Sequence, residues 1–262
     1  MRSARPFRRG KGFRQRNMNR RAQSTGDGEV VLYGWHTVTA ALANPERHIR
    51  KLWATENAAR RLTDAGIKLT VTPEMVRPDA IAARLSPDAV HQGLLAEADP
   101  LPARELADLP AAGLVLALDQ ITDPHNVGAI LRTAAAFAVG AVITTARYSP
   151  DATGVLAKSA SGALEWVPMV AVTNLSRALV ELKERAFQVI GLDGEAPEDL
   201  NALTLARPLA LVLGAEGSGM RQKTRATCDR LARLNLPGEI KSLNVSNAAA
   251  VALYIASKPP QP

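Results

Sequence analysis

Three polar stretches interrupt otherwise apolar segments and carry the side chains best suited to chemistry. The first, residues 119–136, leads from a polar loop into a helix of small and apolar residues, in which Arg132 is the only charge between Asn126 and Val139. A guanidinium in such a helix is expected to be buried and to need a carboxylate, phosphate or substrate partner. The alternative is a surface arginine on a helix that begins with an ordinary N-cap asparagine.

The second stretch, residues 211–220, is a strand pattern that runs into three glycines around Glu216. Glycines let a backbone approach a ligand closely, and a lone carboxylate among them could pair with an arginine or bind a ligand hydroxyl. A flexible turn with a solvated glutamate is the alternative.

The third stretch, residues 234–254, places four polar side chains at the entrance of an alanine-rich helix: Ser242, Asn244, Ser246 and Asn247. One of them is enough to cap the helix, so the other three indicate a polar pocket at its N-terminus. The nucleotide-binding patterns G-x-G-x-x-G after a strand and G-x-x-x-x-G-K-[ST] are absent from the sequence, which argues against a nicotinamide-dependent enzyme.

In order and spacing, DPHNVGAILRTA (residues 123–134), LGAEGSGM (213–220) and SLNVS (242–246) resemble the three motifs of the SpoU (TrmH-type) class of SPOUT RNA ribose methyltransferases. YGWH (33–36) and VHQG (90–93) are similar to parts of that class's substrate-binding domain, which is like ribosomal protein L30e. The combination resembles the branch that modifies a guanosine of large-subunit (23S) ribosomal RNA.

The resemblance implies S-adenosylmethionine-dependent methylation of a ribose 2′-hydroxyl, a homodimer, and a deep trefoil knot in the C-terminal domain. By the motif matches, Gly214, Leu234 and Leu243 fall at cofactor contacts. The matches also assign catalytic or substrate-positioning places to five residues: Asn126, Arg132, Glu216, Ser242 and Asn244. Two residues depart from the family pattern, Asn235 in place of a proline and Asn247 in place of an apolar residue, and both affect loop detail.

The resemblance makes Arg132 the candidate for activating the 2′-hydroxyl. Because a guanidinium has a very high pKa, we expect Arg132 to polarise the hydroxyl or hold the adjacent phosphate rather than accept the proton. The proton acceptor is unassigned, since His125 at the helix entrance is expected to be structural. A non-catalytic RNA-binding relative would lose Arg132 or the polar residues of the third motif, and the chain retains them.

The elements that must position these residues alternate between strand and helix patterns. This alternation predicts an α/β fold. In the C-terminal part, strands are expected at residues 114–118, 141–145, 169–172, 189–192 and 209–213, with helices at residues 127–138, 175–186 and 245–257. Such alternation predicts a parallel sheet covered on both faces, with the chemistry in loops after residues 118, 192 and 213.

A smaller α/β domain is predicted at residues 29–98, from short runs at residues 30–32, 35–42, 49–54, 56–65, 68–72 and 91–96. Three prolines between residues 99 and 112 indicate a linker, and residues 113–262 are the predicted methyltransferase domain.

The positive charge is concentrated at the N-terminus. The net charge is +7, and residues 1–26 contain nine Lys and Arg without Asp or Glu, so the rest of the chain is close to neutral, at −2. We expect residues 1–28 to be a disordered tail that binds phosphate; a solubilising or targeting segment is the alternative.

The whole composition favours a cytoplasmic RNA-binding enzyme without metal or membrane segment, since one cysteine and four histidines lack metal-ligand spacing and no apolar run could span a bilayer. Ribosomal RNA is the expected substrate, and transfer RNA is the main competitor.

Overall fold

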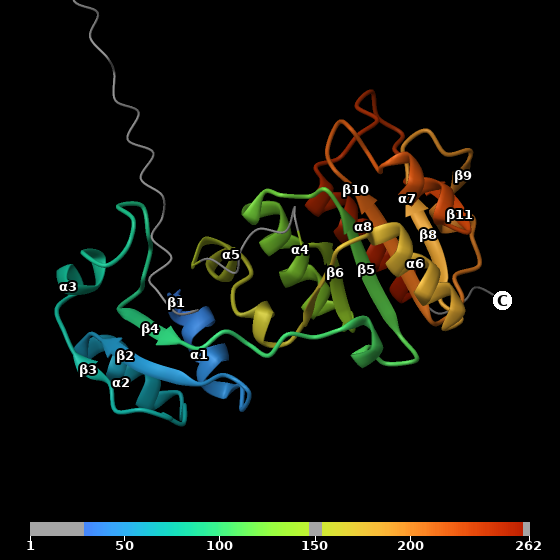
Figure 1. Cartoon of the computed structure of the whole chain (residues 1–262). Helices are drawn as coiled ribbons and strands as arrows, with labels where there is room; N and C mark the ends of the chain where they lie inside the picture. The colour runs from blue at the N-terminus through green and yellow to red at the C-terminus, as the bar shows by residue number, and fades with distance from the viewer. Residues whose placement is uncertain (1–28, 147–153, 259–262) are drawn as a thin grey trace, which may run out of the picture.

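Two β-sheets organise the chain in the computed structural model, which describes residues 29–146 and 154–258 (Figure 1). A four-stranded sheet forms the N-terminal lobe, with strand order β1-β4-β2-β3, and a seven-stranded sheet forms the C-terminal lobe, with order β7-β6-β5-β10-β8-β11-β9. The tail predicted at residues 1–28 lies outside the described residues. No helix in the described ranges is long and apolar enough to cross a membrane.

The N-terminal sheet is built around β4, which pairs antiparallel with β1 on one side and β2 on the other, while β3 adds to β2 in parallel. Its strands and helices are β1 (Val30–Tyr33), α1 (Trp35–Ala43), β2 (Ile49–Ala54), α2 (Glu56–Asp64), β3 (Glu74–Met75), α3 (Pro78–Ala82) and β4 (Leu94–Ala98). The prediction of a regular element at residues 68–72 is wrong, because the short parallel strand forms further on, at Glu74–Met75.

Every strand pairing in the C-terminal sheet is parallel, as the alternating pattern predicted. The strands are β5 (Leu114–Asp119), β6 (Ala141–Thr145), β7 (Met169–Val172), β8 (Gln188–Leu192), β9 (Glu198–Asp199), β10 (Leu209–Gly214) and β11 (Arg230–Arg233). All residues of β5 are buried, and β5 and β10 lie side by side in the middle of the sheet. This placement explains why both strands are continuous apolar runs in the sequence.

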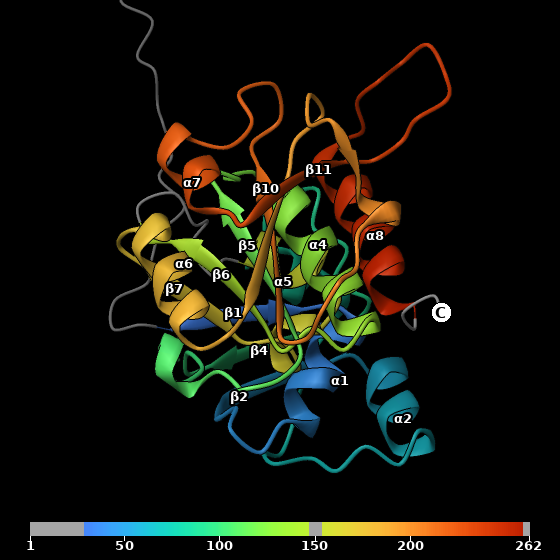
Figure 2. The ribbon, with the colours of Figure 1, turned by 90° about the vertical axis from the view of Figure 1, so that its right-hand side faces the viewer.

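Helices cover both faces of this sheet (Figure 2). On one face lie α4 (Pro124–Ala136), α5 (Gly154–Ser159) and α8 (Val245–Ser257), and on the other lie α6 (Leu175–Glu184) and α7 (Gln222–Thr227). Alternate residues of β5 enter two separate cores, Leu114, Leu116 and Leu118 toward α4 and α8, and Val115 and Ala117 toward α6. The prediction of a sheet covered on both faces is confirmed. Three short 3-10 helices complete the described part of the chain: η1 (Leu106–Asp108), η2 (Ala163–Glu165) and η3 (Leu200–Ala202).

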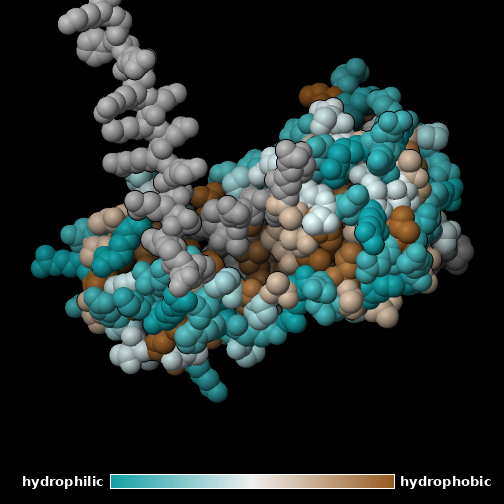
Figure 3. Space-filling view, viewed as in Figure 1, coloured by the Kyte–Doolittle hydropathy of each residue, from teal (hydrophilic) through white to brown (hydrophobic). Residues whose placement is uncertain are grey.

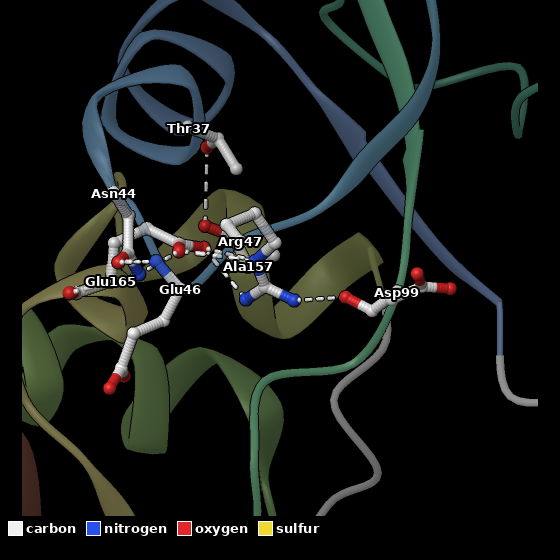
Figure 4. A network of polar contacts seen from close by, with 7 residues as sticks. All are labelled: Thr37, Asn44, Glu46, Arg47, Asp99, Ala157 and Glu165. Carbon is white, nitrogen blue, oxygen red and sulfur yellow. Dashed lines mark hydrogen bonds and ion pairs between the residues drawn. The ribbon is translucent and has the colours of Figure 1, made fainter. Parts of the chain in front are cut away.

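A buried polar network joins the two lobes (Figure 4). The Arg47 guanidinium forms an ion pair with Glu165 at 2.8 Å, and their side chains are only 4% and 2% exposed. Asn44 Nδ2 donates to Glu165 Oε2 at 2.8 Å, and Thr37 Oγ1 donates to the carbonyl of Ala157 at 3.2 Å. These contacts link α1 and the loop after it to α5 and η2. They fix the N-terminal lobe on the face where α5 lies.

Candidate functional site

The carboxyl ends of β5 and β10 meet at one edge of the sheet, where Asp119 and Gly214 are direct partners in the strand register. The first polar stretch begins at Asp119 and the second surrounds Gly214. Two stretches almost a hundred residues apart in sequence are thereby neighbours, at the edge where parallel sheets bind ligands.

Asp119 holds this edge together. Its side chain is fully buried, with Oδ2 accepting from the backbone N–H of Arg221 at 2.8 Å and Oδ1 accepting from Arg221 Nε at 2.7 Å. A buried carboxylate that accepts from both the backbone and the guanidinium of one arginine makes a strong, directional contact. The sequence patterns did not single out Asp119, although a carboxylate that ends an apolar strand was a usable signal.

The glycine-rich stretch forms a tight turn after β10. Ala215 and Gly219 exchange backbone hydrogen bonds, at 3.1 and 2.8 Å, and Gly217 and Gly219 have positive φ angles of 77° and 66°. A Cβ atom on Gly214 would overlap the backbone of Gly219 and Met220, so only glycine lets the turn fold back onto the strand end. Glu216 stands exposed on this turn, and its side chain has no hydrogen-bond or ion-pair partner among the described residues.

The entrance of α4 meets the entrance of α8 at this edge. Asp123 caps α4 by accepting from the backbone N–H of His125 at 2.9 Å. Asn126, in the first turn, is half-buried, and its Oδ1 accepts a hydrogen bond from Asn244 Nδ2 at 3.1 Å. Two of the predicted site residues, 118 positions apart, are therefore in direct contact.

Asn244 caps α8 and has its amide orientation fixed from both sides. Its Oδ1 accepts from the backbone N–H of Ser246 at 2.9 Å and from Ser246 Oγ at 2.6 Å, so its Nδ2 points to Asn126. Within the described part of the chain, Asn126 Nδ2 donates to no group. The pair thus presents one free amide donor at the site, while Ser242 is exposed nearby in sequence.

The expectation that Arg132 is buried is wrong. Arg132 is exposed on α4, and its guanidinium forms no ion pair or hydrogen bond with any residue in the described ranges, Glu216 included. The buried stripe of α4 comprises Val127, Gly128, Ile130, Leu131 and Ala134. Arg132 instead shares the outer stripe with His125, Ala129 and Ala136, and the small alanines there made the outer face look like an inner one in the sequence.

The outer face of α8 is also apolar and uncovered. Val251 and Tyr254 are 39% and 56% exposed, one helical turn apart, and Asn247 continues the same stripe. Helices α4 and α8 pack side by side on the sheet (Figure 2). Exposed Arg132 on α4 and the apolar stripe on α8 therefore belong to the outer surface of one helix pair.

Of the predicted cofactor residues, Gly214 ends β10, and Leu234 and Leu243 lie in the loop after β11. Leu234 is half-buried against the core that includes Val245, whereas Leu243 is 36% exposed and Ile240 is 78% exposed. In the space-filling view, apolar surface appears near the tip of the long loop between β11 and α8 (Figure 3). Exposed apolar side chains beside a polar helix entrance suit a ligand with a planar apolar ring and polar substituents.

No group of three or more His, Cys, Asp or Glu side chains that could hold a metal ion occurs in the described residues. The only cysteine of the sequence, Cys228, packs beside Gly191 and Met220, and burial raises the pKa of its thiol to about 11.

Comparisons with known proteins match both lobes. Residues 113–254 match the SpoU rRNA Methylase family, and residues 31–103 match a family described as RNA 2′-O ribose methyltransferase substrate binding. A relative from Pseudomonas aeruginosa, described as 23S rRNA (guanosine-2′-O-)-methyltransferase RlmB, is 42% identical over 237 residues, covering 85% of this chain and 94% of its own. A relative of the same description from Ralstonia nicotianae is 41% identical, covering 86% and 93%.

Solved structures agree with this match. A putative RNA methyltransferase of the TrmH family from Porphyromonas gingivalis superimposes with a TM-score of 0.73 at 27% identity, over 87% of this chain and 89% of that one. The SpoU methyltransferase AviRb from Streptomyces viridochromogenes, solved with the cofactor AdoMet, gives a TM-score of 0.73 at 24% identity, over 88% and 89%. The likeness to the second structure is one of fold.

Proposed function

The chain belongs to the SpoU rRNA methylase family, and from this premise we propose that it transfers a methyl group from S-adenosylmethionine to the ribose 2′-hydroxyl of a guanosine in 23S ribosomal RNA. The observation that carries the proposal is the match to relatives of that description at about 40% identity over more than nine-tenths of their length. The substrate places the activity in the cytoplasm, where ribosomes are assembled.

The two lobes divide the work in this proposal. Residues 29–98 bind the RNA, residues 99–112 link the lobes, and residues 113–262 carry out the transfer, while the basic residues 1–28 add phosphate contacts. The matched family models support the first and third assignments, since one describes substrate binding and the other a methylase.

The loop segments after β10 and β11 fit S-adenosylmethionine. Gly214 allows the turn to close on the strand end, and Leu234 and Leu243 would contact the adenine with the apolar surface that they expose or support. When bound there, S-adenosylmethionine supplies a methyl group that is already electrophilic. The protein's task is to orient the ribose hydroxyl for in-line attack and to favour loss of its proton.

The asparagine pair supplies orientation. Asn244 is held by its own helix cap and in turn fixes Asn126, whose free Nδ2 would donate to a ribose or phosphate oxygen. Ser242 and Glu216 are exposed on the flanking segments and would contact the nucleotide. Arg132 would polarise the 2′-hydroxyl or hold the adjacent phosphate, and the proton acceptor stays unassigned.

We also propose a homodimer that pairs the outer faces of α4 and α8, and two features of these faces support it. The guanidinium of Arg132 has no partner within one copy of the described chain, and the stripe of Val251 and Tyr254 beside it leaves apolar surface in water. Pairing two copies of this face would bury that stripe and bring Arg132 to a site composed of both subunits. Light scattering at micromolar concentration tests this, and a monomer that still methylates RNA would contradict it.

Methyl transfer to ribosomal RNA tests the proposed function directly. We expect the protein to methylate 23S rRNA transcripts with labelled S-adenosylmethionine, and mapping by nuclease digestion and mass spectrometry to place the methyl on one guanosine ribose. Methylation of transfer RNA alone would assign the competitor substrate. A folded protein that binds RNA but methylates neither would show it to be a non-catalytic relative.

A further inference from the structure

Lys158 occupies the seam between the two lobes. It lies on α5 of the methyltransferase lobe, half-buried, with its Nζ atom packed on the backbone of Gly34 in the N-terminal lobe. A Cβ atom on Gly34 would come within 2.5 Å of Lys158 Nζ, and the ring of Tyr33 lies 6.0 Å from it. The ammonium group is therefore at the boundary where β1 ends and α1 begins.

Among the described residues, no carboxylate pairs with the ammonium group of Lys158. No hydrogen bond or ion pair joins it to any residue in the described ranges, and burial lowers its pKa. By contrast Lys183, on the opposite face of the sheet, forms an ion pair with Asp229 at 2.7 Å and donates to the carbonyl of Thr227. The ring of Tyr33 is a contact of this half-buried charge within the described residues, and a ring face only partly compensates for lost hydration, so the position of Lys158 suits an anion such as a phosphate.

On the side of the N-terminal lobe, a shallow hollow of about 300 Å³ continues from the seam, lined by Arg61, His91 and Gln92 among others. Gln92 has a positive φ of 52° and accepts from the backbone N–H of Trp35 at 2.9 Å. The guanidinium of Arg61 lies over the ring of Trp35, 3.7 Å from its centre. This surface offers positive charge and amide groups, the groups that bind nucleic-acid backbones.

On the other side, α5 contacts the start of α4. Ser159, next to Lys158, lies with its Oγ 3.3 Å from His125 Nδ1, and His125 precedes Asn126 of the site. A Cβ atom on Gly128 would overlap Ser159, so α4 and α5 are in close contact here. Helix α5, which carries Lys158, thus lies between the N-terminal lobe and the entrance of α4.

The seam has a fixed geometry. Besides the Arg47–Glu165 ion pair, Gly162 lets α1 approach so closely that a Cβ atom there would meet Ala40 at 2.6 Å. These contacts hold α5, and Lys158 with it, close to the N-terminal lobe.

We propose that Lys158 binds a backbone phosphate of the RNA at the point where the strand crosses from the N-terminal lobe to the methyl-transfer site. The proposal rests on the proposed function for the identity of the RNA, and it makes Lys158 a positioning residue. Other contacts to the RNA strand would come from the hollow around Arg61 and Gln92 on one side and from the entrance of α4 on the other.

The test compares Lys158→Gln, Lys158→Arg and the control Lys183→Gln in the full chain, with a 23S rRNA transcript as the probe. Removing one charge-assisted phosphate interaction should weaken binding roughly ten-fold and reduce the log-log salt slope by about 0.7 to 0.9. Lys158→Arg should restore most of both quantities. Lys183→Gln should change neither, because Lys183 is already paired on the opposite face.

Binding and methyl transfer are measured separately, so the two proposals fail in different ways. Absence of transfer by the wild-type protein would overturn the proposed function, whereas an unchanged salt slope in Lys158→Gln would overturn the role of Lys158. Thermal melts accompany each variant. If Lys158→Gln lowers the melting temperature, Lys158→Met is measured instead, because methionine keeps the apolar part of the side chain and removes the charge. An RNA-binding salt slope equal to that of the wild type in the folded Lys158→Met protein would show that Lys158 has only a structural role.

Discussion

Replacing Glu165 by alanine should lower the free energy of unfolding much more than breaking an exposed ion pair in the same region does. The substitution removes the carboxylate that accepts from Arg47 Nε and Nη2 and from Asn44 Nδ2, while Arg47 Nη1 keeps its bond to the carbonyl of Asp99 at 2.7 Å. With the two side chains 4% and 2% exposed, the guanidinium would stay buried without its counter-ion.

Breaking a buried pair in this way costs about 3–5 kcal/mol, which corresponds to roughly 150- to 4000-fold in the equilibrium that holds the lobes together. The control is Glu46→Ala, because Glu46 forms an ion pair with Arg104 at 2.6 Å with side chains 50% and 40% exposed. That exposed pair should contribute at most about 1 kcal/mol.

Urea unfolding gives the free-energy difference, and hydrogen exchange at α1, α5 and η2 shows whether the seam opens before the lobes unfold. The double variant Arg47→Met with Glu165→Leu should recover most of the loss, since it removes both charges. The reasoning would be refuted if the free energy of unfolding of Glu165→Ala lies within about 1 kcal/mol of that of the wild type and hydrogen exchange at α1, α5 and η2 is as slow as in Glu46→Ala.

Three further predictions concern the site, the tail and the cysteine. Arg132→Ala should lower the single-turnover methyl-transfer rate by roughly 10²- to 10⁴-fold without changing the melting temperature or cofactor binding, and Arg132→Lys should also fail, because an ammonium cannot replace a planar fork of donors. A folded Arg132→Ala protein with a near-normal rate would remove Arg132 from the mechanism. Deleting residues 1–26 should weaken RNA binding and reduce its salt slope by about 0.7 for each phosphate of single-stranded RNA that the tail neutralises; an unchanged slope would mean that the tail does not bind RNA. Cys228, with its pKa raised by burial to about 11, should react with a thiol reagent at pH 8 much more slowly in the native protein than in urea, and equal rates would contradict its burial.

The sequence predicted the central strands and the long helices because their apolar patterns are continuous. It missed β9 and β11, whose residues Glu198, Asp199, Arg230 and Arg233 are polar, and the short helix at Gly154–Ser159. It also missed the Arg47–Glu165 pair, since nothing local in the sequence relates two positions 118 residues apart. The trefoil knot stays a prediction.

For the site, the family resemblance placed Asn126 and Asn244 among the catalytic or substrate-positioning residues, and the structure brings the two side chains into contact. Their roles stay predictions. The exposure of Arg132 agrees with the alternative that the sequence left open, and the helical period favours it: Val127, Ile130, Leu131 and Ala134 form one apolar stripe, and Arg132 lies off that stripe. The alanines of the outer face weakened the contrast between the two faces, so the arginine was expected to be buried.

The hydrogen bond between Asn126 and Asn244 also determines how late in synthesis the candidate site can form. Its second partner is the cap of α8, and α8 packs beside α4 on the same core, so a growing chain that ends before Asn244 lacks the partner and one that ends before Ser257 lacks the complete helix. Contacts between such distant positions form slowly, since a long loop must close first. A nascent chain therefore has no assembled candidate site while α8 is still inside the ribosome, and we expect the newly made protein to modify RNA only after α8 has left the ribosome that made it.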